Sequence, residues 1–205
     1  SQFFQIHSEN PQKRLIHQTV EIIRQGGVIV YPTDSGYAFG CQIGNKQALD
    51  KIRSIRRLDK KHNFTLVCRD LSEIGTYAQV DNTQYRMLKA HTPGAYTFIL
   101  QATREVPKRL MHAKRRTIGI RVPDNIIAQA ILAELGEPIL SSTLILPGEE
   151  LPLTDPYDIR QMLERQLDLI IDGGFCGFEA TTVIDFEDEV PYVVRKGLGD
   201  TTPFE

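Results

Sequence analysis

The chain has 205 residues, of which 41% are hydrophobic, with 24 Lys and Arg against 26 Asp and Glu. These values suit a folded globular chain with a real core and exclude intrinsic disorder of the whole. No apolar run approaches the roughly 18–20 residues of a membrane helix, and the first residues lack the basic-then-apolar layout of a secretion signal. Three widely spaced cysteines, Cys41, Cys68 and Cys176, cannot all pair and form no CxxC, so we expect a reduced, cytoplasmic compartment and no membrane contact.

The net charge of −2 conceals a strong segregation of charge along the chain. Residues 1–50 hold 4 basic and 4 acidic side chains, residues 51–121 hold 16 and 5, and residues 122–205 hold 4 and 17. The middle segment therefore carries +11 and the last segment −13. A middle segment of this kind favours an anionic partner; the alternative is that the two segments neutralise one another in the fold.

Apolar periodicity and capping residues predict alternating helices and strands through the first half of the chain. A helix through residues 15–23 ends at Gly26-Gly27, and a buried strand over residues 28–31 follows it. Asn45 is placed to cap the next helix, whose core face is Ala48, Leu49, Ile52 and Ile55. A strand over residues 64–68 comes next, and Ser72 and Asp81 are placed to cap two short helices.

The second half of the chain predicts further strands and ends in a hairpin. The predicted strands cover residues 96–100, 117–122, 138–140, 169–171, 181–186 and 192–195. Asp124 is placed to cap a helix that ends near Gly136, and Asp155-Pro156 opens another. Strands that alternate with helices early and pair antiparallel late predict a mixed-sheet α/β fold. Since no linker rich in Gly, Ser or Pro divides it, we expect a single domain over residues 1–205.

The sharpest local feature is the segment over residues 31–40, where a buried strand leads into Pro32-Thr33-Asp34-Ser35-Gly36. Such a turn can bring backbone N–H groups and the hydroxyls of Thr33 and Ser35 close to a polar ligand. It is neither a phosphate-binding GxxxxGK[ST] loop nor a GxGxxG dinucleotide loop. The alternative is an ordinary strand-exit turn, in which Thr, Asp, Ser and Gly are common.

Two basic clusters lie within the positive middle segment, over residues 51–61 and 104–121. Most charge runs are solvated surface, but like charges that gather need a counter-charge, which nucleotide phosphates or an RNA backbone would provide. Arginine also suits bidentate phosphate contacts. The candidate RNA-binding residues are Arg53, Arg56, Arg57, Lys60, Lys61, Arg109, Lys114, Arg115 and Arg116.

Other chemistry finds little support in the sequence. The five histidines show no HxxxH or HExxH spacing, and there is no GxSxG motif. We therefore expect no metal site, and expect Cys68 and Cys176 to be packed rather than reactive.

Five blocks in chain order resemble the signatures of the YrdC-like, or threonylcarbamoyl-adenylate synthase, family, and look most like its YciO branch. The loop over residues 32–40 is similar to PTDT-x-YGLG, and residues 92–97 to WPGPxT. Residues 117–123 are similar to TVAVRxP, residues 180–185 to ESTVVD, and residues 195–197 to RxG. The blocks extend over most of the chain, which makes the combined resemblance specific.

The resemblance implies a single domain with a twisted mixed parallel and antiparallel sheet, flanked by helices, with a basic concave face. It implies conversion of L-threonine, bicarbonate and ATP, with Mg²⁺, into threonylcarbamoyl-adenylate for the t6A modification of tRNA. No tightly bound cofactor is expected. The alternative is binding of double-stranded RNA or tRNA on the basic concave face without adenylation. By resemblance, Thr33, Arg121 and Thr181 hold the threonine moiety. The residues expected on the nucleotide side are Arg56, Arg57, Thr117, Ser141, Thr143 and Arg195.

Two positions depart from the family pattern. The place expected for its KxR motif reads Ile55-Arg56-Arg57-Leu58, without a lysine. Its SxN motif aligns with residues 143–145, where Thr143 keeps a hydroxyl but Ile145 has neither donor nor acceptor in its side chain. We therefore expect binding of nucleotide or RNA to be retained and the adenylation machinery to be altered.

Overall fold

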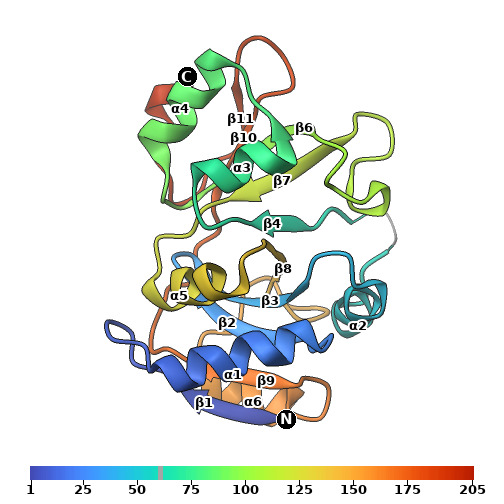
Figure 1. The fold of residues 1–205 in the computed structure, drawn as a ribbon, viewed down its shortest axis with the longest axis vertical. Coiled ribbons are helices and arrows are strands. Elements are labelled where there is room, and N and C mark those ends of the chain that lie inside the picture. The colour runs from blue at the N-terminus through green and yellow to red at the C-terminus, as the bar shows by residue number, and fades with distance from the viewer. Residues whose placement is uncertain (60–61) are drawn as a thin grey trace.

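The computed structural model describes residues 1–59 and 62–205, so the expected phosphate contacts of Lys60 and Lys61 lie outside the described residues. One mixed sheet runs through these residues in the order β1-β9-β2-β3-β8-β4-β7-β6-β10-β11, with the short β5 paired to β6. Six α-helices flank the sheet (Figure 1). The mixed α/β architecture predicted from the sequence is confirmed.

The elements are bounded as follows. The strands are β1 (Gln2–Gln5), β2 (Ile29–Thr33), β3 (Gly36–Gln42), β4 (Thr65–Val67), β5 (Ala78–Gln79), β6 (Tyr96–Ala102), β7 (Thr117–Arg121), β8 (Ile139–Thr143), β9 (Leu169–Asp172), β10 (Thr182–Asp185) and β11 (Tyr192–Arg195). The α-helices are α1 (Lys13–Arg24), α2 (Lys46–Arg56), α3 (Leu71–Tyr77), α4 (Asn82–His91), α5 (Ile126–Leu135) and α6 (Pro156–Leu163). Two short 3₁₀ helices, Lys108–Leu110 and Thr202–Phe204, complete the list.

Side-chain caps begin most of the helices. Asn45 accepts a hydrogen bond from the backbone N–H of Ala48, as predicted, and Asp81 closes a capping box with Gln84. Two predicted caps were wrong by one or two residues. Helix α3 begins after Asp70 instead of Ser72, and α5 begins after Asn125 instead of Asp124.

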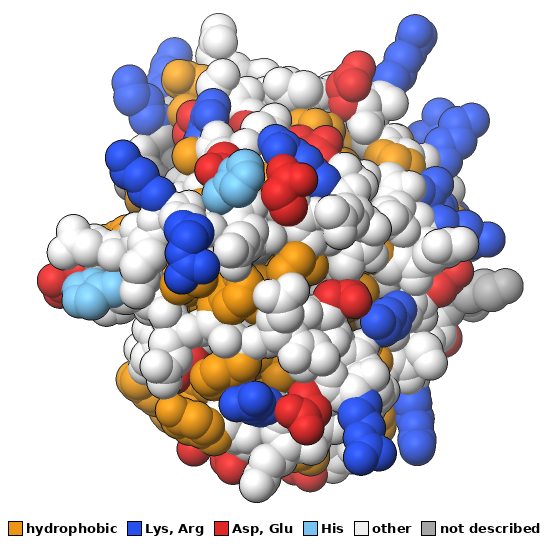
Figure 2. All heavy atoms as spheres, turned by 60° about the horizontal axis from the view of Figure 1, so that its bottom comes forward, with side chains coloured by type: hydrophobic (Ala, Val, Ile, Leu, Met, Phe, Trp, Pro, Cys, Tyr) orange, Lys and Arg blue, Asp and Glu red, His pale blue; other side chains and the backbone are white. Residues whose placement is uncertain are grey.

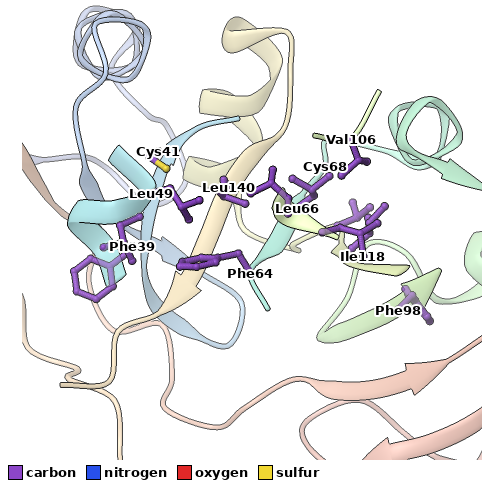
Figure 3. Close-up of a cluster of buried hydrophobic side chains, with 14 of the residues drawn as sticks. Phe39, Cys41, Leu49, Phe64, Leu66, Cys68, Phe98, Val106, Ile118 and Leu140 are labelled. Carbon is purple, nitrogen blue, oxygen red and sulfur yellow. The ribbon is translucent and has the colours of Figure 1, made fainter. Parts of the chain in front are cut away.

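One face of the sheet carries an apolar row that crosses five strands. Cys41, Leu140, Leu66, Ile120 and Phe98 are paired in register from β3 to β6. Figure 3 shows Cys41, Leu140, Leu66 and Phe98 following one another across the strands. Helices α2, α3 and α4 cover this face with Leu49, Ile74 and Leu88, which are buried in the same cluster. The row is the main core of the fold.

The opposite face is apolar over one half of the sheet and polar over the other. Helices α1 and α5 contact each other and pack over β2, where Ile29 and Tyr31 are fully buried. Across β8, β4 and β7, the paired residues on this face are Ser141, Thr65 and Gly119. Hydroxyls and a glycine at the middle of three neighbouring strands do not form a core, so this half of the face is suited to contact a ligand.

The segment over residues 31–40 is a tight hairpin, and most of it is strand. β2 ends at Thr33 and β3 begins at Gly36, so only Asp34 and Ser35 form the turn. Gly36 has φ +124°, a conformation that L-residues with side chains rarely adopt. The sequence therefore located the turn but missed the second strand, whose residues are buried against β8.

Charges that are segregated along the sequence mix in the fold. Arg115 pairs with Asp185 and Glu187, and Lys51 pairs with Asp168, so basic residues of the middle segment meet acidic residues of the last. On the face shown in Figure 2, basic and acidic side chains are interspersed. Part of the positive segment is thus neutralised internally. Within the described residues, no helix has the length and apolar character needed to span a bilayer.

Candidate functional site

A cavity of about 560 Å³ opens over the polar half of the sheet. Its floor comes from β3, β4, β6, β7, β8 and β10, and the loops after β8 and on either side of β10 and β11 form its walls. The predicted site residues that line it are Arg56, Arg121, Ser141, Thr143, Thr181 and Arg195. The fold therefore brings together residues from α2, β7, β8, β11 and the segment before β10, which the resemblance assigns to the threonine and nucleotide moieties.

Arg121 enters the cavity from the end of β7 and is nine-tenths buried. Its Nη1 donates to the Ser35 hydroxyl at 2.9 Å, and its Nη2 pairs with the Asp34 carboxylate. Its buried Nε has no hydrogen-bond partner in the described structure. An unpaired buried N–H is rare and costs free energy, which is more common at functional sites than in ordinary cores.

Arg195 is at the end of β11, and its guanidinium lies near that of Arg121 on β7. Its Nε and Nη2 donate to the carbonyl of Thr181 at 3.1 and 2.9 Å, and Nη2 also reaches the Thr181 hydroxyl at 3.1 Å. That hydroxyl shares a 2.8 Å hydrogen bond with Thr97 on β6. Desolvation first, and then repulsion from Arg121, lower the pKa of Arg195 from its usual value. Arg195 thus brings a positive charge to the cavity beside Arg121, whose own charge is paired with Asp34.

Arg56 ends α2 and reaches across to the loop after β8. Its Nε donates to the carbonyl of Ile145 at 3.0 Å and its Nη1 to the hydroxyl of Ser142 at 2.6 Å. Burial lowers the pKa of Arg56. Within the described residues, neither Arg56 nor Arg195 has a carboxylate at salt-bridge distance, so both charges are left for a ligand.

Ser141 is oriented by a fully buried tyrosine. Its hydroxyl donates to the carbonyl of Phe39 at 2.8 Å, so the Tyr31 hydroxyl, also at 2.8 Å, must donate to Ser141. Burial is the main cause that raises the pKa of Tyr31 to about 12, which keeps it a donor at neutral pH. Ser141 can therefore offer a ligand only an acceptor lone pair.

Three predicted residues do not line this cavity. The Thr33 hydroxyl donates to the carbonyl of Gly36 at 2.6 Å inside the hairpin, and Ser35 lines the cavity instead. Thr117 lines a smaller neighbouring cavity of about 160 Å³, which shares Thr65 and Thr97 with the larger one. Arg57 follows α2 with φ +55° and is exposed.

The remaining expected RNA contacts fall into two groups. Arg57, Arg109, Lys114 and Arg116 are exposed. Arg53 is mostly buried, pairs with Asp50 and lies over the Phe64 ring. Arg115 is partly buried and is held by Asp185 and Glu187. An RNA backbone would therefore meet the first group more readily than the second.

Several site residues were not singled out from the sequence. Asp34, Thr97 and Lys196 either line the cavity or hold a residue that does. Asp34 belongs to the turn between β2 and β3, which the sequence did identify. Its role was missed because its partner, Arg121, is 87 residues away in the chain and no local pattern links the two residues. Among the described residues, no group of three or more His, Cys, Asp or Glu is placed to hold a metal ion.

The chain is similar to known proteins over most of its length. Residues 21–197 match the family model Sua5_yciO_yrdC, described as telomere recombination. The chain is 61% identical to YciO of Escherichia coli over 204 residues, covering 100% of this chain and 99% of that protein. It is 26% identical over 193 residues to a putative threonylcarbamoyl-AMP synthase of Methanocaldococcus jannaschii, covering 93% and 89%.

Solved structures show the same fold. The crystal structure of E. coli YciO superposes with a TM-score of 0.96, 60% identity and full coverage of both chains. The structure of P. abyssi Sua5 complexed with L-threonine gives a TM-score of 0.87 at 22% identity, covering 96% of this chain and 58% of that one. The chain therefore belongs to the Sua5/YciO/YrdC family.

Proposed function

We propose that the cavity binds L-threonine together with an adenine nucleotide, as a threonylcarbamoyl-adenylate would require. The observation that carries this proposal is the convergence of Arg56, Arg121 and Arg195 on one cavity, where Arg56 and Arg195 lack a carboxylate partner within residues 1–59 and 62–205. Guanidinium groups in a partly desolvated cavity bind carboxylates and phosphates through charge-assisted hydrogen bonds. Relatives named threonylcarbamoyl-AMP synthases and a Sua5 structure with L-threonine support the choice of ligands.

The hydroxyls on the cavity floor would orient the ligand. Thr181 and Thr97 form one pair, and Ser141 presents an acceptor whose direction Tyr31 fixes. A reaction that joins threonine, bicarbonate and ATP needs its reactants held in line and its developing charge stabilised. The arginines and hydroxyls supply both, and the mechanism requires no nucleophile from the protein.

Magnesium would enter with the nucleotide as part of the substrate. The only carboxylates that line the cavity within the described chain, Glu150 and Glu179, are exposed at its rim. Magnesium in nucleotide sites is commonly held by substrate phosphates and water, which fits this sparse donor set.

The altered SxN position limits what the site offers a nucleotide. Ile145 lines the cavity, and its carbonyl already accepts from Arg56. We therefore propose that ligand binding is retained and that turnover to the adenylate is slow, because a polar side chain is missing beside the expected phosphates.

Calorimetry with L-threonine and a non-hydrolysable ATP analogue plus Mg²⁺ tests the proposal. We expect both to bind, with Arg195→Ala weakening the analogue about 10–100-fold, the range for a lost charge-assisted hydrogen bond. Arg14→Ala, at an exposed position on α1 and outside the cavity lining, is the matched control. Release of pyrophosphate on adding threonine, bicarbonate and MgATP then measures the reaction itself. Failure to bind either ligand would refute the proposal.

A second candidate function is binding of double-stranded RNA or tRNA beside the cavity. The observation that favours it is a set of exposed cations that form no ion pair within the described residues: Arg57, Arg109, Lys114 and Arg116. Affinity carried by phosphate contacts should fall steeply with salt concentration. Charge reversal at Lys114 and Arg116 should abolish binding of a duplex RNA, whereas an affinity independent of salt would count against this function.

A further inference from the structure

Asp34 is tied to two distant parts of the chain. One of its carboxylate oxygens pairs with Nη2 of Arg121, and the other accepts the backbone N–H of Asp124 at 2.8 Å. Its side chain is only 11% exposed. Because both oxygens are engaged, Asp34 is held against Arg121 by the start of the loop that leads into α5, and a ligand has to bind with this ion pair in place.

Because of the Arg121–Asp34 pair, positive charge is distributed unevenly over the cavity lining. At Arg121 the positive charge is compensated, whereas the charges of Arg56 and Arg195 have no carboxylate partner in the described chain. Lys196 adds a further positive charge to the lining, and the exposed Glu150 and Glu179 at the rim face water. A compensated guanidinium still donates hydrogen bonds but attracts a multiply charged group only weakly.

We propose that Asp34 is the positioning residue that sets which part of the ligand Arg121 receives. Because its charge is compensated, Arg121 donates hydrogen bonds to a singly charged carboxylate, whereas polyanionic phosphates bind at Arg56 and Arg195. The ligand class is thus a molecule with one carboxylate and a separate polyphosphate, bound in a single orientation. This inference rests on the proposed function, since it assigns the two groups within the same cavity.

Asp34→Asn separates this role from a purely structural one. The change removes the compensating charge but keeps the shape of the side chain and one acceptor oxygen. We expect L-threonine binding to weaken tenfold or more, because the guanidinium loses its anchor. Binding of tripolyphosphate should instead strengthen by about threefold or more at low salt, because the cavity gains a full positive charge. A structural defect would weaken both ligands.

Two variants serve as controls. Asp50→Asn makes the same charge change at an exposed ion pair on α2, outside the cavity lining, and should alter neither affinity. Ser35→Ala removes one hydrogen bond to Arg121 without changing charge, so it should weaken L-threonine and leave tripolyphosphate unchanged.

A ligand-free measurement distinguishes this inference from the proposed function. The ¹H–¹⁵N signal of the Arg121 Nε–H should be resolved and slow to exchange in the unaltered chain and broadened in Asp34→Asn. If the unaltered chain binds no L-threonine, the proposed function fails, and tripolyphosphate and this signal still test Asp34. Tripolyphosphate affinity that falls or stays constant in Asp34→Asn, or an unchanged Nε–H signal, would overturn the inference.

Discussion

The hydrogen-bond chain from Tyr31 through Ser141 to the carbonyl of Phe39 gives a quantitative test of how the cavity floor is held. Tyr31→Phe removes one buried hydrogen bond of 2.8 Å, for which we expect a loss of about 1 kcal/mol in the free energy of unfolding. Ser141→Ala breaks two bonds and leaves the Tyr31 hydroxyl buried without an acceptor, so the expected loss is about 2–3 kcal/mol. Removing both partners leaves no orphaned hydroxyl.

The double variant should therefore lose less than the sum of the single losses, by about 1 kcal/mol. Urea unfolding followed by circular dichroism measures all three variants, and an unchanged dependence on urea would show that the unfolded state is unaltered. Single losses that add within about 0.5 kcal/mol would show that the two hydroxyls are not coupled, and would refute this account of how Ser141 is oriented.

Three further predictions concern groups around the cavity. Burial raises the pKa of the Cys176 thiol to about 11 from its usual 9.0. Because the thiolate is the reactive form, iodoacetamide at pH 8 should alkylate Cys176 about 100-fold more slowly than a free thiol. Mass spectrometry measures the rate, and a rate equal to that of a free thiol would contradict this prediction. Burial first, and then Arg56, lower the pKa of His62 below its usual 6.5, so its contribution to stability is complete above pH 6.5 and declines as the pH falls from there towards its lower folded value. A proton NMR titration of its ring with a midpoint at or above 6.5 would be inconsistent with that environment. Arg115→Ala should destabilise the fold by about 1–2 kcal/mol in thermal unfolding, because the buried Asp185 loses its charge partner. Asp185 then keeps the hydrogen bonds from the Tyr192 hydroxyl and the backbone N–H of Glu187. An unchanged melting temperature would show that the ion pair contributes nothing to stability.

Local signals in the sequence were sufficient for most elements. Asn45, Asp81 and Asp155 each cap the helix they were predicted to begin, because capping depends on residues within one turn. Strands β1 and β5 were missed because they are short and are defined by their partners β9 and β6. Helix α5 begins after Asn125, whose side chain accepts from the backbone N–H of Ala128, while the backbone N–H of Asp124 donates to Asp34 in the hairpin, a contact across 90 residues that no local pattern reveals.

The candidate site was predictable only in part, for the same reason. The family signatures located Arg121, Thr181 and Arg195 in the sequence, and the fold brings them to one cavity. The positive charge of the middle segment, in contrast, is a poor guide to the free charge of the surface. Arg115 is neutralised by residues 70 and 72 positions later, and such pairing depends on sheet order, which composition does not encode.

The order of strands also has a consequence for the time at which the site becomes functional. β10 and β11 follow the other strands of the described residues in sequence, and β10 pairs with β6, more than 80 residues before it. Thr181 and Arg195 can therefore reach the cavity only after β10 and β11 have been synthesised. The core beneath α1 and α5 takes its last residues from β9, whereas the cavity lining extends to Gly197. Premature termination before β10 would thus remove Thr181 and Arg195 and leave an incomplete site, and long-range pairing of this kind is expected to form slowly.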